Sequence, residues 1–219
     1  MPMMKRLFFR RVLLPAIALC SLVVPVNGAH AALVTYSFTG NLNPTLDPLG
    51  LVPVSGSFQF DNTTSGSGGA YNGAVTGFTL NFGGLYSSSF KSGANAVTIS
   101  QNMPLGNGIV DRWALVSAAS GPNLHGYTPF SFDLRFDHKG GGLFGDTSLQ
   151  DPPSLSSLTT GKWRLFFEDS EGNPAVYLGS IASLTAVPLP AAVLLFGAGL
   201  ISLVGLGAGG LRNLRRTQA

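Results

Sequence analysis

Short segments in which apolar and polar residues alternate place the tightest limit on how this chain can fold. Val34, Tyr36 and Phe38 alternate with threonine and serine. A period of two puts one set of side chains on each face of a β-strand, so that one face can pack in a core while the other meets water. The same pattern recurs in four further segments, at residues 54–60, 78–82, 131–137 and 162–168.

Between residues 32 and 186 no comparable stretch shows the 3.6-residue period of an amphipathic helix over ten residues. Weaker candidate strands lie at 96–100, 109–117 and 175–184, and the glycine-rich breaks between segments are typical of turns. Eight to ten short antiparallel strands predict an all-β domain of the β-sandwich or jelly-roll type. A closed barrel is the alternative.

Charged residues are distributed unevenly along the chain, whose 219 residues carry a formal net charge of +3. Residues 32–186 contain six Lys and Arg against ten Asp and Glu, so this region is acidic. The other positive charges lie at the two ends of the chain, at Lys5, Arg6, Arg10, Arg11, Arg212, Arg215 and Arg216. An acidic domain is a poor surface for a phosphate backbone, so we expect no nucleic-acid partner.

The first 31 residues have the three parts of a secretory signal peptide. A positively charged start is followed by an apolar stretch at 12–24, which is too short to span a bilayer comfortably. Ala29 and Ala31 then supply the small residues that signal peptidase requires at positions −3 and −1. We expect cleavage after Ala31 and export of the rest of the chain, with an uncleaved anchor as the alternative.

The single cysteine, Cys20, lies inside this apolar stretch. One thiol excludes an internal disulfide framework and a zinc site built on several thiolates. The residues before it loosely resemble a lipoprotein acceptor motif, but Leu19 is bulky where a small residue is expected. We therefore expect Cys20 to leave with the signal peptide, and lipid attachment is the alternative.

The C-terminal end combines a proline-containing motif, an apolar run and an arginine cluster, in that order. The motif consists of Val187, Pro188, Leu189, Pro190, Ala191 and Ala192. Residues 191–211 carry no charge and would form about 30 Å of helix, enough to cross a membrane. Arg212, Arg215 and Arg216 would stay on the cytoplasmic side, so the central domain would lie outside the inner membrane.

This order of elements resembles the PEP-CTERM sorting signal of Gram-negative bacteria, in its VPLPA variant. The resemblance implies transient anchoring in the inner membrane and then processing by an exosortase, an integral membrane cysteine protease or transpeptidase. It also implies delivery to the cell surface or the medium and an association with exopolysaccharide and biofilm. Segments 36–40, 54–61 and 78–84 resemble strands of the central domains of such proteins, which implies a β fold and no catalytic residue. A permanent single-span anchor is the alternative to processing.

The chain thus divides into a signal peptide at 1–31, an exported β domain at 32–186 and a sorting tail at 187–219. The tail comprises the motif at 187–192, the apolar helix at 191–211 and the arginine-rich end at 212–216.

Acidic residues provide the first candidate sites in the central domain. Asp133, Arg135 and Asp137 share one face of a predicted strand, which favours a row of surface ion pairs over a metal site or the paired carboxylates of a glycosidase. The segment that starts at Asp61 begins like a calcium loop, with oxygen-bearing residues at positions 1, 3 and 5. Its twelfth position is Asn72 rather than a bidentate glutamate, so an ordinary turn explains it as well.

Aromatic residues provide the second kind of candidate. Tyr71 and Tyr127 lie in predicted loops and could form an exposed platform on which a sugar ring stacks. Trp113 and Trp163 alternate with apolar residues and are predicted to lie in the core. His125 is expected to be exposed in a turn.

The sequence therefore predicts a non-enzymatic surface or matrix protein that needs no cofactor. Its expected partners are signal peptidase, an exosortase, the inner membrane before processing, and exopolysaccharide. A carbohydrate-binding module is the first alternative, and a secreted hydrolase that uses Asp133 or Asp137 is the second.

Overall fold

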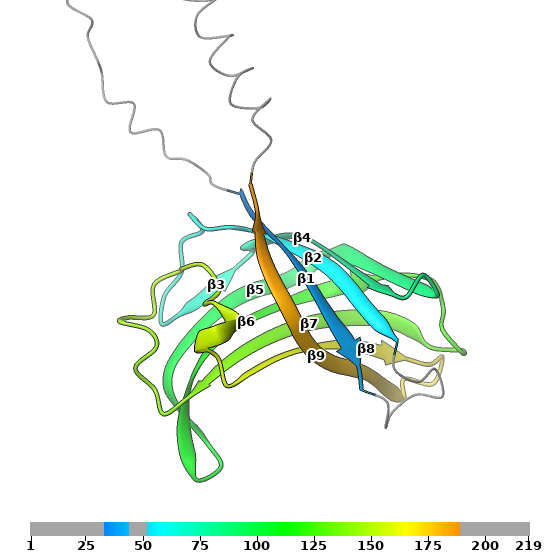
Figure 1. Cartoon of the computed structure of the whole chain (residues 1–219). Coiled ribbons are helices and arrows are strands. Elements are labelled where there is room, and N and C mark those ends of the chain that lie inside the picture. Colours follow the sequence, from blue (N-terminus) through cyan, green and yellow to red (C-terminus); the bar gives the residue numbers. More distant parts are fainter. Residues whose placement is uncertain (1–32, 44–51, 189–219) are drawn as a thin grey trace, which may run out of the picture. The chain divides into compact units, whose positions relative to one another are not determined.

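The computed structural model describes residues 33–43 and 52–188, which form nine strands (Figure 1). The strands are β1 (Leu33–Leu42), β2 (Pro53–Asp61), β3 (Ala70–Asn72), β4 (Val75–Phe82), β5 (Tyr86–Leu105), β6 (Gly108–Ser120), β7 (Thr128–Lys139), β8 (Thr160–Glu168) and β9 (Pro174–Val187). One turn of 3₁₀ helix, Leu155–Ser157, precedes β8. The expected signal peptide with Ala29 and Ala31, the apolar helix at 191–211 and the three C-terminal arginines lie outside the described residues. Within the described ranges, no helix is long and apolar enough to cross a membrane.

The strands form one antiparallel sheet that closes on itself. Its order is β5-β4-β2-β1-β9-β8-β7-β6, and β6 pairs back with β5. The short strand β3 is added to the second half of β5, where Ala70 pairs with Thr98. The fold is therefore an eight-stranded barrel with one extra strand. The all-β prediction is confirmed, whereas the expected β-sandwich or jelly roll is wrong.

The sheet closes at β5, which pairs with other strands along both of its sides. The first part of this 20-residue strand pairs with β4, and its later part pairs with β3. Along its other side it pairs with β6 from Ser89 to Leu105, with two register shifts. A closed barrel removes the free edges that an open sheet presents to other chains.

Aromatic side chains fill the inside of the barrel. The largest fully buried ones are Trp113, Trp163, Phe38, Phe58, Phe60, Phe82, Phe132, Phe136 and Phe167. The rings contact one another across the barrel, for example Phe78 on Phe132 with centroids 4.4 Å apart. An eight-stranded barrel has an interior just wide enough for side chains to fill it. The predicted core positions of Trp113 and Trp163 are confirmed, since both are 0% exposed.

The connection between β7 and β8, residues 140–159, packs over one end of the barrel. Three polar groups from the barrel wall donate to its backbone carbonyls. Tyr71 Oη donates to Thr147 O at 2.7 Å, Trp113 Nε1 to Gln150 O at 2.9 Å, and Gln101 Nε2 to Phe144 O at 2.6 Å. Because a buried donor without a partner is costly, these bonds allow polar aromatic groups to lie inside the barrel end.

Charged residues occupy only part of the barrel wall. Strands β9, β1, β2 and β4 carry one charged residue between them, Asp61 at the end of β2. Strands β6, β7 and β8 carry nine Asp, Glu, Lys and Arg residues: Asp111, Arg112, Asp133, Arg135, Asp137, Lys139, Lys162, Arg164 and Glu168. The acidic domain thus has one charged wall and one nearly uncharged wall.

Candidate functional sites

The predicted sorting motif begins at the last residue of the final strand. Val187 is the last residue of β9 and pairs with Thr35 of β1, so the two ends of the described domain lie side by side (Figure 1). Pro188 follows and cannot donate a backbone hydrogen bond to a neighbouring strand, which suits a strand end. The rest of the motif, Leu189 to Ala192, lies outside the described residues.

Asp133 and Asp137 are both held by arginines on the outer face of the charged wall. Asp137 accepts two hydrogen bonds from Arg112, at 2.7 and 2.9 Å, in a bidentate pair. Asp133 accepts from Arg164 Nε at 2.9 Å and from Arg135 Nη2 at 3.2 Å. The predicted sharing of one face is thus seen, and each carboxylate is bound by a cation rather than directed at the other.

Asp133 is only 6% exposed although it points outward from the barrel. Burial raises the pKa of Asp133 above its ordinary value, and the positive charge of Arg164 opposes the rise. In the part of the chain that the structure describes, no three His, Cys, Asp or Glu residues come together in a group that could hold a metal ion. Arg112 on β6 and Arg164 on β8 thus form ion pairs with the two aspartates of β7, which lies between them.

Asp61 organises a turn after β2. Its Oδ1 accepts hydrogen bonds from the backbone nitrogen of Thr63 at 2.8 Å and from Thr63 Oγ1 at 2.6 Å. These bonds lower the pKa of Asp61. An aspartate that binds the backbone two residues on is the usual start of an Asx turn, so the turn interpretation describes this segment better than the calcium loop.

The exposed tyrosine platform predicted from the sequence is wrong for Tyr71. That residue is 7% exposed, because the loop at 140–159 covers it and accepts its hydroxyl hydrogen bond. Tyr127 is half-buried and packs against the core beside a tight turn. His125 and Gly126 occupy the turn with φ of 52° and 92°, and His125 is exposed, as predicted.

The exposed aromatic ring that the sequence analysis missed is Phe130, which is 41% exposed. A register shift between Pro129 and Ser131 interrupts the pairing of β7 with β8 beside it. The ring of Phe130 lies 6.2 Å from that of Phe166, and the guanidinium of Arg164 stacks over Phe166 at 4.8 Å. A bulge changes which residues face outward, so simple alternation could not place Phe130.

Asp111 is the second residue that the sequence analysis missed. It is fully buried, and its carboxylate accepts hydrogen bonds from the backbone nitrogens of Asn102 at 2.7 Å, Leu143 at 2.7 Å and Phe144 at 3.2 Å. Burial acts to raise the pKa of Asp111, but these three donors and the nearby His138 outweigh it and hold the pKa below its ordinary value. The signal in the sequence is the position of this acidic residue two residues before Trp113, on the same face of the strand as Trp113 and Leu115.

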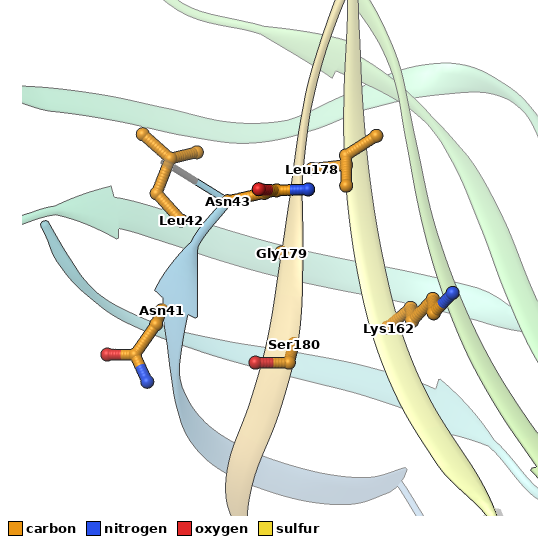
Figure 2. Close-up of a pocket in the computed structure, with 7 residues that line it drawn as sticks. All are labelled: Asn41, Leu42, Asn43, Lys162, Leu178, Gly179 and Ser180. Carbon is orange, nitrogen blue, oxygen red and sulfur yellow. The ribbon is translucent and has the colours of Figure 1, made fainter. Parts of the chain in front are cut away.

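Two hollows lie side by side on the barrel wall. Figure 2 shows the first, of about 390 Å³, which is lined by Asn41, Leu42, Asn43, Lys162, Leu178, Gly179 and Ser180. The second, of about 520 Å³, is lined by Thr39, Gly40, Asn41, Pro53, Val54, Ser55, Gly83, Gly84 and Ala182. The two hollows share Asn41, and Lys162 is the one charged residue among their described linings.

Two rows of small polar side chains cross the nearly uncharged wall from β9 to β4 and end on β5, and we call them the hydroxyl ladder. Its first rung consists of Thr185, Ser37, Ser57, Thr79 and Ser89. Its second rung consists of Ser183, Thr39, Ser55, Asn81 and Ser87. Each member is the direct cross-strand partner of the next. Single strands with Ser or Thr at every second position are visible in the sequence, but their alignment depends on the register between strands.

No family model, curated protein or solved structure matches this chain.

Proposed function

We propose that this chain is an exported cell-surface or matrix protein of a Gram-negative bacterium, sorted through its C-terminal tail by an exosortase. In this proposal the barrel is not an enzyme, and it acts in the exopolysaccharide matrix around the cell. The observation that carries the proposal is the order of proline motif, apolar run and arginine cluster at the C-terminal end, and the pairing of Thr35 with Val187 shows that β9 ends at the first residue of that motif.

In the sequence, the expected signal-peptidase site and the predicted sorting motif flank the nine strands. β1 begins at Leu33, two residues after the expected signal-peptidase site at Ala31, and β9 ends at the first residue of the motif. Cleavage at both points would leave all nine strands in place. The motif would follow the barrel wall without an intervening linker, so that the barrel would stand close to the membrane until the tail is removed.

Two features of the barrel support a role without catalysis. Its interior is packed with aromatic rings, which leaves the candidate acids on the outer wall. There Asp133 and Asp137 are each bound by arginines, so that each carboxylate is directed at a cation and not at the other carboxylate. A hydrolase of the paired-carboxylate type needs one acid that keeps its proton near neutral pH and faces the other across the substrate.

The sorting proposal is tested by the mass of the mature protein. We expect expression of the full-length gene in a Gram-negative host that carries an exosortase to yield a protein that starts at Ala32 and has lost the apolar helix at 193–211 together with the residues after it. The same gene in a host without an exosortase is the control, and there the tail should remain. Retention of the tail in the mature protein of the first host contradicts the processing step.

A carbohydrate-binding module is the second candidate function, and one observation favours it. The wall formed by β9, β1, β2 and β4 combines aligned hydroxyl groups with almost no charge. Binding of the purified protein to neutral glycans, with and without a chelator, separates this function from a purely structural role.

A further inference from the structure

We propose that the hydroxyl ladder and the two hollows beside it form a binding surface for a neutral polysaccharide. The inference deepens the proposed function, on which it rests for the encounter with exopolysaccharide, because it names the face of the barrel that makes contact. Three observations support the inference: the register of five strands, the absence of charged residues in the two rungs and the position of the hollows.

The register of the strands turns separate side chains into continuous rows. Ser37 of β1 pairs with Thr185 of β9 on one side and with Ser57 of β2 on the other. Ser57 pairs in turn with Thr79, and Thr79 with Ser89. Neighbouring strands lie about 4.8 Å apart, so a rung of five residues extends over roughly 19 Å. The second rung runs about 7 Å away along the strands. The ladder is therefore long enough for several sugar units of an extended chain.

The hydroxyl groups hold one another in place. Thr39 Oγ1 and Ser183 Oγ are 2.6 Å apart in one rung, and Ser57 Oγ and Thr79 Oγ1 are 2.9 Å apart in the other. A hydroxyl donates one hydrogen bond and can accept two, so each pair retains capacity for a ligand. Because one hydrogen bond in water contributes little, binding needs many of them at fixed positions, and the ladder provides this.

The charge of the surface restricts the class of ligand. None of the ten residues in the two rungs is charged. The nearby charges are two lysines, Lys91 two residues after Ser89 in β5 and Lys162 in the lining of the first hollow. Nucleic acids and anionic polymers require Lys and Arg at their contact points. An uncharged polymer with many hydroxyl groups is the ligand whose chemistry matches the ladder.

The lack of apolar anchors argues against a protein partner. Seven large hydrophobic residues are exposed among the described residues: Leu33, Leu85, Leu105, Ile109, Val116, Phe130 and Val187. None of them belongs to a rung. Protein interfaces place aromatic and apolar side chains at their centre and contain little serine, so the ladder has the opposite composition.

The two hollows are depressions in the barrel wall next to the second rung. Thr39 and Ser55 of that rung line the second hollow together with Ala182. Ala182 is the extra residue of a β-bulge, since Thr39 pairs with Ser183 and Gly40 pairs with Ile181. Its short side chain leaves space where a larger residue would fill the wall. A sugar chain that lies along the rung can place ring substituents in this space and, past Asn41, in the hollow of Figure 2.

Retention on solid polysaccharides tests the inference with protein purified after expression of the full-length chain. Microcrystalline cellulose and cross-linked dextran serve as neutral probes, and alginate beads serve as the anionic probe. We expect retention on a neutral probe that is unchanged between low and high salt, because screening acts on charges and not on hydroxyl contacts. Retention on neither neutral probe, or on alginate alone, overturns the proposal.

Matched variants then locate the contact. T39V together with T79V removes one hydroxyl from each rung, keeps the side-chain shape and suits a β-strand. We expect its affinity for the neutral probe to fall about tenfold. T39S together with T79S keeps both hydroxyls and should bind like the original protein. An equal loss in both double variants overturns the role of the hydroxyl groups.

Two further results would also overturn it. Phe130 is the exposed ring on the other wall, and F130A should leave retention unchanged. Loss of retention in F130A but not in T39V/T79V would move the site to that ring. A dimer in light scattering that T39V/T79V dissociates would make the ladder a contact between copies of this chain. The mass of the mature protein and its binding to the solid polysaccharides are measured on the same sample. A protein that still carries the C-terminal tail but binds the neutral probe contradicts only the sorting route.

Discussion

At the scale of single residues, the buried carboxylate of Asp111 joins a strand to a distant loop through hydrogen bonds. It binds the backbone of β5 at Asn102 and the backbone of the 140–159 loop at Leu143 and Phe144. The loop in turn accepts the hydroxyl of Tyr71 and the indole N–H of Trp113. One acid therefore holds in place the segment that lets two polar aromatic residues lie in the core.

We expect D111N to lower the free energy of unfolding by about 2 kcal/mol, because an amide supplies one acceptor where the carboxylate supplies two. Urea unfolding followed by circular dichroism measures the loss. The control is D146N, in an exposed Asx turn where Asp146 Oδ1 binds the backbone of Ser148, and it should change the midpoint little.

The effect of D111N should depend on pH in a defined direction. Because the folded protein lowers the pKa of Asp111 from 3.8, the contribution of this group is fully present above about pH 4 and is lost as the pH falls. The difference in stability between the original protein and D111N should therefore shrink from pH 6 to pH 3. A difference that stays constant over this range would contradict the assigned role of the charge.

At the scale of elements, the contact between β1, β9 and β8 leaves no room for a side chain at Gly179. A Cβ atom there would lie 1.9 Å from the carbonyl oxygen of Asn41 and 2.8 Å from the ring of Trp163. The backbone oxygen belongs to a paired strand and the ring lies in a packed core, so neither can move freely. This glycine sets how closely β1 and β8 approach β9.

We expect G179A to destabilise the barrel by about 3 kcal/mol or to prevent folding, since overpacking displaces both strand and core. The matched control is G77A in β4, where the nearest heavy atom to the added methyl group would be Gln59 Cβ at 4.0 Å. G77A should be close to neutral. Soluble yield and thermal midpoint, measured side by side, compare the two. Similar losses of stability in G179A and G77A would mean that the lost flexibility of glycine, and not the close contact at Gly179, causes the effect.

The strongly alternating segments of the sequence became strands, and the exceptions have physical causes. β5 was expected only at 96–100, yet it extends from Tyr86 to Leu105. Its first half is rich in serine and contains a register shift between Phe90 and Asn95, so it shows little apolar alternation.

The position of Tyr71 was predicted wrongly for a related reason. Its burial comes from a loop that is distant in sequence, and local pattern carries no information about such a cover.

At the scale of the whole molecule, a closed ring of strands around one core should behave as a single cooperative unit. Trp113 on β6 and Trp163 on β8 both lie in this core, and their neighbours include Phe60 and Phe82 from the other wall. The sheet has no separable half, because every strand of the ring pairs on both sides.

We therefore expect one unfolding transition in urea, with tryptophan fluorescence and far-ultraviolet circular dichroism giving the same midpoint. The two probes differ in what they report, since fluorescence follows the core and circular dichroism follows the strands. Separate midpoints would show that part of the wall opens before the core does.

The sequence alone was enough to predict the all-β class, several of the strands and the core positions of both tryptophans, because a period of two and the burial of apolar side chains are local properties. It also supplies the motif and charge pattern at the two ends, on which the sorting proposal rests. Closure of the barrel, the arginine partners of Asp133 and Asp137 and the alignment of the hydroxyl ladder were decided only by tertiary structure. Each depends on which strands pair and in which register, and a shift of one residue would turn every side chain of a strand to the other face.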